Sequence, residues 1–504
     1  MDGQVRGPKA AITIIVMLAA LMAMVDISIV NVALTDIRAS FATPLDQIGW
    51  VSTGYMMANI VIIPMTGWFQ RRFGFKKYFA ASVLLFTVAS ALCGTAWSLP
   101  SLVAFRMLQG IGGGAIIPTA QSILFARYPR SEHGMASGLF GLGAITGPLL
   151  GPTIGGYLID ASSWHWIFLI NVPIGIAVAG LAWKFIDEPG FVAERRPIDG
   201  MGIALLATGM PALQYVLEEG NRDGWFDSTR ITILAAIAVI ALVTFVAHEL
   251  EAPHPVVDLS VFKNRSYAAG TGINFLTGAA LFGSSYLFSL FCGTILNYTA
   301  LDTGRVFLVA GLAQILLMPL VGRFAPKIDP RVLLLIGVTV LGTSQWYGSR
   351  LTNEAGFHDL VTPQMIRAVG LSFIFIPVSV AALSDLPSAT RGNATGLFNL
   401  TRELGGSIGT AWMGKVVADG MVHHGAALAQ HVTAYDPAVQ DRLAQLAQTG
   451  GPSDAVLSSQ VAGQALVMSF DDGFRLVMFA IFAGLALVLL MKRPVPGVEL
   501  AGAH

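Results

Sequence analysis

Fourteen stretches of the chain are apolar over about 20 residues each, the length that an α-helix needs to cross the hydrocarbon core of a membrane. Polar and charged residues gather in the segments between them. Glycine and proline interrupt many stretches, which membrane helices tolerate because neighbouring helices re-satisfy the freed backbone groups. The pattern predicts fourteen spanning helices, at about 10–34, 48–70, 78–98, 101–126, 134–159, 164–186, 199–218, 229–249, 267–291, 303–323, 331–349, 362–386, 391–418 and 469–491.

The composition agrees with a membrane protein. Of the 504 residues 54% are hydrophobic and only 12% are charged, whereas soluble domains carry roughly a quarter charged residues. A soluble chain this apolar could not cover its surface with polar groups, but a lipid bilayer suits such a surface. Lysine and arginine balance aspartate and glutamate, 30 against 30, so no basic field indicates nucleic-acid binding.

The first apolar run, at about 10–34, is too long for the core of a signal peptide, and no small-residue cleavage site follows it. We therefore expect it to be the first span. Basic residues indicate the orientation, because cytoplasmic segments are enriched in lysine and arginine. Most of the 30 basic residues lie in segments that share one side if both termini face the cytoplasm. This bias predicts an even number of spans with both termini inside the cell.

A long polar segment at about 419–468 separates the last two predicted spans and is expected to face the outside. Its apolar residues Val439, Leu443 and Leu446 recur at helical spacing, which predicts a short amphipathic helix over 438–448. Loops of this length are usually functional or disordered. The segment is therefore either a solvated flap or a docking surface for a periplasmic partner.

Two charged residues stand inside predicted spans. Asp26 lies about 12 Å from the outer end of the first span, and Arg106 lies at a similar depth in the fourth. A charge in mid-bilayer costs on the order of 3 kcal/mol on insertion scales, so such residues usually pair or face a cavity. Asp26 and Arg106 are expected either to form a structural ion pair or to share a proton path.

A repeated glycine-proline pattern occupies the fifth predicted span. Gly147, Gly151 and Gly155 recur every four residues and so form one smooth helical face that a neighbouring helix can approach closely. Pro148 and Pro152 each remove a backbone hydrogen bond and are expected to bend the helix. The pattern predicts a closely packed, kinked seam between helices.

A basic turn follows the second predicted span, and a weaker copy at 322–329 follows the tenth. Matching turns in two halves of the chain indicate an internal repeat. Residues singled out in the first turn are Gly67, Arg71, Arg72, Gly74 and Lys76.

With these motifs, with 166–175 and with Asn399–Arg402, the chain resembles the major facilitator superfamily over nearly its whole length. It is most similar to the fourteen-span drug:proton antiporters of the EmrB-like multidrug efflux group. The resemblance implies an all-α membrane protein with two six-helix bundles, at 10–186 and 267–491, and a two-helix insertion at 199–249. It also implies the bacterial inner membrane as the location.

The resemblance implies roles for individual residues. Asp26 matches an acid linked to proton coupling, and Arg106 matches an arginine linked to proton transfer. The glycines and prolines of the fifth span match the antiporter motif, and the basic turn matches a loop linked to conformational switching. The chain departs from the family at Arg71, where an aspartate is usual, so helix capping through that carboxylate is not expected here.

Glu403 lies near the middle of its span, beside Arg402. Adjacent helical residues point about 100° apart, so we do not expect the arginine to neutralise the acid automatically. Glu403 is therefore predicted to be a second proton- or cation-binding site, or else one half of a structural pair with another helix. Candidates for the lining of the substrate cavity are Tyr55, Asn59, Asn274, Tyr286, Phe398, Asn399 and Arg402.

These features predict proton-coupled export of hydrophobic or amphiphilic compounds by alternating access. The alternative is export of one endogenous metabolite, such as a fatty acid or siderophore. No metal site, catalytic cluster or nucleotide-binding loop is expected, so the proton gradient replaces a cofactor. The resemblance implies an EmrA-like periplasmic adaptor and an outer-membrane channel as partners.

Overall fold

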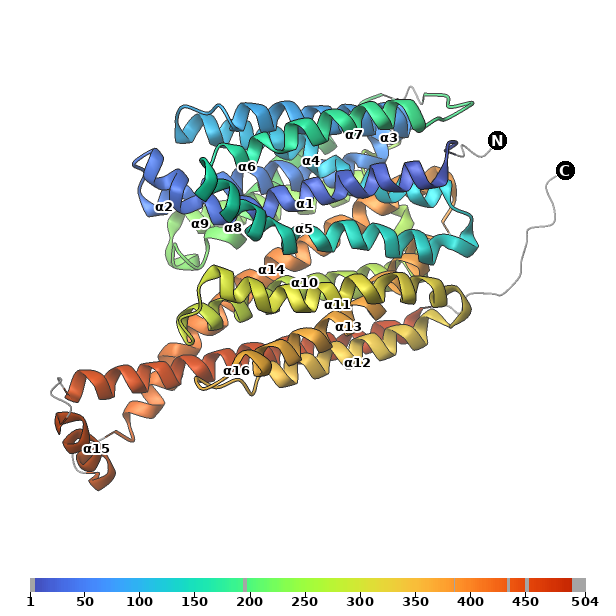
Figure 1. Ribbon diagram of the computed structural model, residues 1–504. Coiled ribbons are helices and arrows are strands. Elements are labelled where there is room, and N and C mark those ends of the chain that lie inside the picture. Colours follow the sequence, from blue (N-terminus) through green and yellow to red (C-terminus); the bar gives the residue numbers. More distant parts are fainter. Residues whose placement is uncertain (1–4, 194–196, 385, 433–435, 449–452, 492–504) are drawn as a thin grey trace.

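The computed structural model describes residues 5–193, 197–384, 386–432, 436–448 and 453–491, and the named elements in these ranges are all helices. The long helices run side by side along one direction (Figure 1). The α-helices are α1 (Lys9–Ser40), α2 (Leu45–Ile48), α3 (Trp50–Cys93), α4 (Leu99–Arg127), α5 (His133–Ala161), α6 (Trp166–Leu169), α7 (Asn171–Phe185), α8 (Gly200–Glu219), α9 (Thr229–Glu251), α10 (Arg265–Thr294), α11 (Ala300–Phe324), α12 (Pro330–Gly348), α13 (Phe357–Leu383), α14 (Ser388–Ala429), α15 (Pro437–Gln448) and α16 (Ser453–Leu490).

Each of the fourteen predicted apolar runs lies on helix. In the described part of the chain, ten helical segments are long and apolar enough to cross a membrane. One of them, α3, contains two of the predicted runs, because the chain changes direction at Gly74 without a separate loop. Gly74 has φ 80° and ψ 163°, a backbone conformation that side chains disfavour and glycine allows.

Polar residues at the ends of the apolar runs fix where several helices begin. Ser98 and Ser101 form a reciprocal capping box at the start of α4, and Thr299 and Asp302 do the same for α11. The Asn264 side chain accepts hydrogen bonds from two backbone N–H groups at the start of α10. These caps satisfy backbone donors that a helix start would otherwise leave unpaired.

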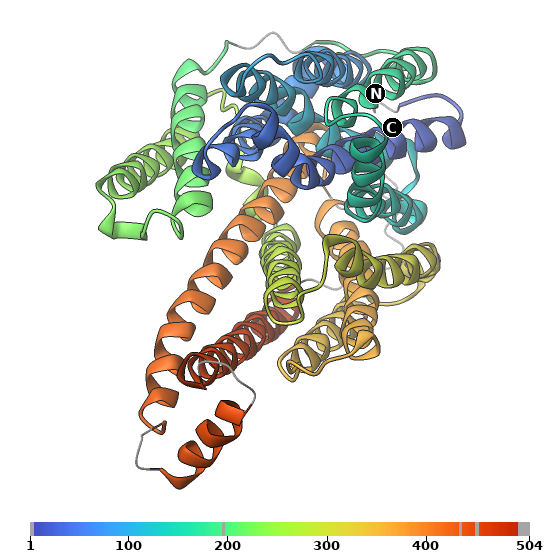
Figure 2. The same ribbon diagram turned by 60° about the vertical axis from the view of Figure 1, so that its left-hand side comes forward.

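The helices form two bundles with a helix pair between them in sequence. Helices α1–α7 make one layer and α10–α16 the other, and the start of α1 and the end of α16 lie at the same end of the molecule (Figure 1). The pair α8 and α9 packs beside both bundles (Figure 2). The Tyr215 ring of α8 lies 5.4 Å from the Trp50 ring of α3, and Gln214 donates a hydrogen bond to Ser407 of α14. Just beyond α8, Asn221 donates to the Ala411 carbonyl.

The outer surface of the helices is apolar. Large aliphatic side chains are exposed along one face of α9 and one face of α11, where water would be an unfavourable surrounding. A lipid bilayer is the solvent that such a surface requires. The exposed set includes Ile233, Ile237, Ile240, Val243, Leu308, Leu312, Leu316 and Leu320.

Much of the segment at 419–468, which was predicted to be a polar loop, is helical. Helix α14 continues to Ala429 and α16 already begins at Ser453, so the two helices project together beyond the bundle (Figure 1). His424 and Asp472 bridge the two extensions at 2.7 Å. The short helix expected at 438–448 is present at the tip as α15.

Candidate functional site

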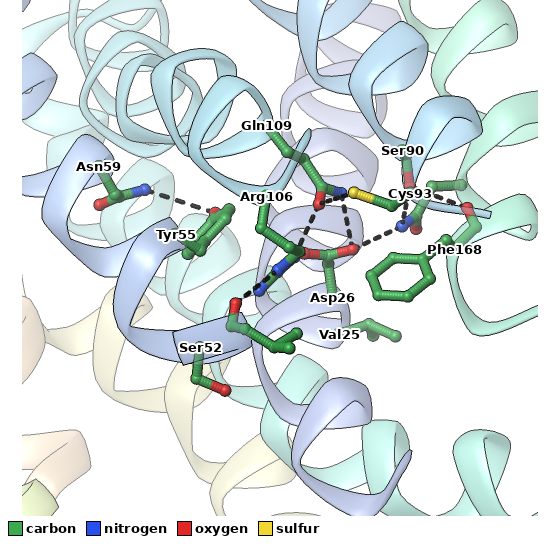
Figure 3. A network of polar contacts seen from close by, with 12 residues as sticks. Val25, Asp26, Ser52, Tyr55, Asn59, Ser90, Cys93, Arg106, Gln109 and Phe168 are labelled. Carbon is green, nitrogen blue, oxygen red and sulfur yellow. Dashed lines mark hydrogen bonds and ion pairs between the residues drawn. The ribbon is translucent and has the colours of Figure 1, made fainter. Parts of the chain in front are cut away.

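Asp26 is the centre of a buried polar network inside the first bundle (Figure 3). One of its oxygens, Oδ2, accepts a hydrogen bond from Arg106 Nη1 at 2.6 Å. The other, Oδ1, accepts from Gln109 Nε2 and from Asn171 Nδ2, both at 2.8 Å. Asp26 is 0% exposed and Arg106 1% exposed. The structure thus brings together the two charges that the sequence placed at similar depth.

The guanidinium of Arg106 is held from several sides. Its Nε donates to the Val51 carbonyl at 3.2 Å, and its Nη1 also donates to Gln109 Oε1 at 2.7 Å. The Tyr55 ring lies 4.3 Å from the guanidinium carbon and provides a cation–π contact. Contacts other than the ion pair with Asp26 therefore also hold Arg106 in place. This suits an arginine whose acidic partner gains and loses a charge.

Further hydrogen bonds position the side chains that contact Asp26. Asn171 Nδ2 also donates to Ser90 Oγ at 3.1 Å, and Ser90 donates to the Phe168 carbonyl at 2.8 Å. The network joins α1, α3, α4, α6 and α7, so a change at Asp26 reaches five elements of the bundle. Such a chain of buried hydrogen bonds is strong when complete and costly when one member is lost.

Gln109 and Asn171 were not among the predicted site residues. Gln109 stands three residues after Arg106 and therefore shares its helical face, which is a signal that the sequence does contain. Asn171 belongs to a motif at 166–175 that carried the resemblance, but its direction depends on how α7 packs. Only the folded structure shows that both amides donate to one carboxylate oxygen.

A second charged cluster lies on α14 in the other bundle. Arg402 donates to Asn399 Oδ1 at 3.0 Å, and Asn399 Nδ2 donates to Gln121 Oε1 of α4 at 2.8 Å. Arg402 also approaches Glu403 Oε1 at 3.6 Å, so the expectation that neighbouring side chains would point apart was wrong for these two. Long flexible side chains close the angle that separates their Cβ atoms. The Glu403 side chain stays partly exposed.

The residues proposed to line a substrate cavity are mostly packed in this state. Tyr55, Asn274, Phe398, Asn399 and Arg402 are buried, while Asn59 and Tyr286 are half-buried. Asn274 Nδ2 donates to the Phe398 carbonyl at 2.6 Å, so these two residues join α10 to α14. Their role as a cavity lining remains a prediction.

The two bundles meet in the half of the molecule that carries the start of α1. Direct hydrogen bonds between described residues of the bundles run from His133 to Ser384, from Ser379 to Ser137, from Arg391 to the Phe125 carbonyl and from Asn399 to Gln121. Gly67 also packs against the backbone of Asn393, and Gly322 against that of Gly134. This half is therefore closed. Glu403 and Asn59 are partly exposed.

The basic turn is capped by a carboxylate that the sequence did not single out. Glu188, from the segment after α7, accepts hydrogen bonds from the backbone N–H groups of Phe75 and Lys76, each at 2.9 Å. These groups follow the bend at Gly74, where the second half of α3 begins. The Lys76 ammonium lies over the Trp183 ring. Arg71 stands where the family usually has an aspartate, and it is partly buried. Glu188 therefore supplies the helix cap in place of a carboxylate at position 71.

Replacing Glu188 with alanine should therefore destabilise the turn. Two backbone donors at a helix start would lose their acceptor, which typically costs about 1 kcal/mol. We expect a lower melting temperature of the detergent-purified protein. Glu354→Ala, in an exposed loop, serves as the control and should melt like the parent. An unchanged melting temperature for Glu188→Ala would show that the cap contributes nothing.

The glycine pattern forms the predicted close seam. Side chains added at Gly147, Gly151 or Gly155 would strike α1, at Met24, Ser28 and Ile29 respectively. The Ser28 hydroxyl donates to the Gly147 carbonyl at 3.2 Å, across the seam. Helix α5 is continuous through Pro148 and Pro152, whose side chains lie outside the described part of the chain.

Comparison with known proteins places these features in a family. The model of the Major Facilitator Superfamily matches residues 16–410. The multidrug export protein EmrB of Haemophilus influenzae is 35% identical over 98% of this chain and 97% of that protein. The fatty acid resistance protein FarB of Neisseria gonorrhoeae is 32% identical over 96% of each. The fold is similar to that of the proton:xylose symporter XylE, with a TM-score of 0.62 at 13% identity, over 96% of this chain and 99% of that one.

Proposed function

The chain belongs to the major facilitator superfamily, and on that premise we propose that it is a multidrug efflux transporter that exchanges hydrophobic or amphiphilic compounds for protons. The relatives named EmrB support the substrate class. The arrangement that we propose has fourteen spans, as two six-helix bundles and the inserted pair α8 and α9. Both termini face the cytoplasm of a bacterium, and the protein lies in the inner membrane.

The observation that carries the proposal is the buried carboxylate of Asp26 with its three donors. Protonation removes its charge and weakens the ion pair with Arg106. A protonated Asp26 still accepts hydrogen bonds from the amides of Gln109 and Asn171, but more weakly, and its new O–H faces a donor or needs an acceptor of its own, so the packing between α1, α3, α4 and α7 changes with the proton. In our proposal this change couples proton entry to the rocking of one bundle against the other.

The contacts that close one half of the molecule indicate which state of the transport cycle the structure represents. If the start of α1 lies on the cytoplasmic side, the contacts between Gly67 and Asn393 and between Ser137 and Ser379 close that side. The structure then represents a state that is closed to the cytoplasm. Glu403 is a second proposed proton site, because it is an acid within α14 whose side chain stays partly exposed beside Arg402.

Proton release from vesicles tests the proposal directly. Purified protein is reconstituted with an acidic interior and a pH-sensitive dye, and an amphiphilic cation such as ethidium is added outside. We expect substrate-dependent loss of the pH gradient, in a saturable manner. Equal responses from vesicles with and without protein would refute proton-coupled exchange.

Export of fatty acids is a second candidate function. The relative FarB is named for resistance to fatty acids, and the buried cation Arg402 lies three residues from Asn399 on the same face of α14. Such a cation suits the carboxylate of an amphiphilic acid. The same vesicles, given lauric acid in place of ethidium, separate the two candidates by which compound dissipates the gradient.

The projecting end of α14, α15 and α16 is proposed to contact a periplasmic adaptor of the EmrA type. It extends beyond the bundle on the side opposite the start of α1, where a partner can reach it (Figure 1). Helix α15 is amphipathic, with Leu446 buried and Asp441 and Arg442 exposed. In this arrangement the adaptor leads to an outer-membrane channel.

Removing residues 426–464 should separate transport from partner contact. Gly425 lies close to Ala465, so a short glycine-serine linker can join them without moving α14 or α16. We expect the shortened protein to exchange ethidium for protons in vesicles like the parent, but to give no drug resistance to a double-membraned cell that contains the adaptor. Full resistance in that cell would contradict docking at this end.

A further inference from the structure

The inserted helix pair carries two buried acids that the proposed transport mechanism does not use. Asp199 stands directly before α8, and Glu249 stands in the last turn of α9. Both lie at the end of the pair from which residues 252–264, here called the connector, lead to α10. Glu249 is 3% exposed, and the Asp199 side chain is 10% exposed. A buried acid needs a cation or a proton, because a lone charge is costly away from water.

The two acids approach each other beside Gly202. A Cβ on Gly202 would lie 2.5 Å from Asp199 Oδ2 and 2.5 Å from Glu249 Oε1, so the two oxygens are no more than twice that distance apart. Neither oxygen accepts a hydrogen bond from a described residue. Two carboxylates this close in a buried place repel each other, and such pairs commonly hold one proton between them. Water between the two oxygens would leave both charges in place.

The other groups around the pair can balance one negative charge. Among the described residues, the ionisable side chains that face Glu249 are Asp199 and His248. His248 Nε2 lies 2.9 Å from the other oxygen of Asp199, Oδ1, which also accepts a hydrogen bond from the Gly202 N–H at 2.9 Å. Glu249 Oε2 accepts from the Val257 N–H at 3.1 Å. Since a charged histidine balances a single carboxylate, a proton is needed to neutralise the second.

The connector joins this acid pair to the closed half of the molecule. Its Val257 is bonded to Glu249. The next residue, Asp258, forms two hydrogen bonds with the Asn393 side chain of α14: its N–H donates to Oδ1 at 3.1 Å, and its carbonyl accepts from Nδ2 at 2.6 Å. Gly67 of α3 packs against the backbone of the same Asn393. A change at Glu249 therefore reaches a contact between the two bundles through two residues of the connector.

We propose that Asp199 and Glu249 together bind one proton at the cytoplasmic end of the inserted pair. With the proton bound, one acid donates a hydrogen bond to the other, and Glu249 still accepts from Val257. When the proton leaves to water, the two charges repel, Glu249 moves the connector, and the closed contact at Asn393 weakens. The cytoplasmic position of the site rests on the proposed orientation of the chain, whereas the proton site itself does not.

Thermal unfolding at different pH tests the proton site. The full-length, detergent-purified protein and its Glu249→Gln variant are melted from about pH 5 to about pH 9 in buffer with EDTA. The folded pair keeps a proton that the separated carboxylates of the unfolded chain release, so the parent should lose stability as the pH rises. Glutamine has the shape of the protonated acid and cannot ionise, so the melting temperature of the variant should fall by a few degrees less.

Two further variants assign the effect to the acid pair. Glu251→Gln changes an exposed acid in the same turn of α9 and should follow the parent at every pH. Asp199→Asn keeps a side chain that can cap α8 and should follow Glu249→Gln, so either variant decides the result if the other fails to fold. The proton site is overturned if the melting temperatures of the parent and of these two variants fall in parallel.

Distances across the cytoplasmic side test the link through the connector. Spin labels are attached after Arg130→Cys and Lys327→Cys, at two exposed positions on different bundles, while the native Cys93 and Cys292 are buried. Raising the pH should increase the fraction of long distances more in this protein than in the same protein with Glu249→Gln. Equal increases would overturn the link. A protein that does not exchange ethidium for protons in vesicles would refute the proposed function and leave the melting curves unaffected.

Discussion

Asp26→Asn is expected to abolish proton-coupled export. Asparagine keeps the shape of the side chain and can still accept a hydrogen bond through its oxygen, but it cannot gain or lose a proton. Arg106 would lose its counter-ion and stay buried, which costs several kcal/mol when a buried pair is broken, so a lower melting temperature should accompany the loss. In proton-loaded vesicles, ethidium should no longer dissipate the gradient, and efflux from cells should fall to background.

Two comparisons show whether the loss belongs to this carboxylate. Asp36→Asn changes an exposed acid of the same helix and should leave exchange unchanged. Glu403→Gln should reduce exchange and change its pH dependence, because the proposal gives that acid a proton of its own. If Asp26→Asn exchanges ethidium for protons at the rate of the parent, the network has only a structural role. If Glu403→Gln matches the parent at every pH, the second site is wrong.

Gly151→Leu is expected to prevent the first bundle from forming. Even the first carbon of a new side chain would overlap the Ser28 hydroxyl and approach the backbone N of Ile29 at 3.1 Å. Overpacking of a tight core commonly costs 1–3 kcal/mol, and backbone contact leaves less room for relief than side-chain contact does. We expect loss of the monodisperse peak in size-exclusion chromatography of the detergent-solubilised protein.

Gly156→Leu is the matched control for the seam. It lies on the same helix, five residues further on, and a Cβ added there would meet nothing within 4 Å. The control should elute and melt like the parent. If both variants elute like the parent, close approach of α1 and α5 is not needed for folding.

The sequence predicted the helices well because membrane spans depend on one strong signal, a run of about 20 apolar residues. The same signal missed the extensions of α14 and α16. Residues 419–429 and 453–468 interleave apolar residues with polar ones and glycine, so they form helix without containing a continuous apolar run. Hydropathy detects helices that are surrounded by lipid. It does not detect helices that extend into water, so these extensions were not predicted.

The centre of the site was predictable only in part. Asp26 and Arg106 stood out because a charge in an apolar run is rare. Amides carry no charge, so Gln109 and Asn171 gave no comparable signal. Glu188 lies in a polar connecting segment, where an acid is ordinary, and its function as a cap depends on contact across 112 residues of sequence.

Helix α8 limits how the two bundles can separate. It is bonded to α14 through Gln214 and packed on α3 through Tyr215, and these helices belong to different bundles. Any movement that parts α3 from α14 near these residues must stretch or release one attachment. The inserted pair thereby acts as a tether across the moving boundary, so the amplitude of opening depends on two helices that lie outside both halves of the repeat.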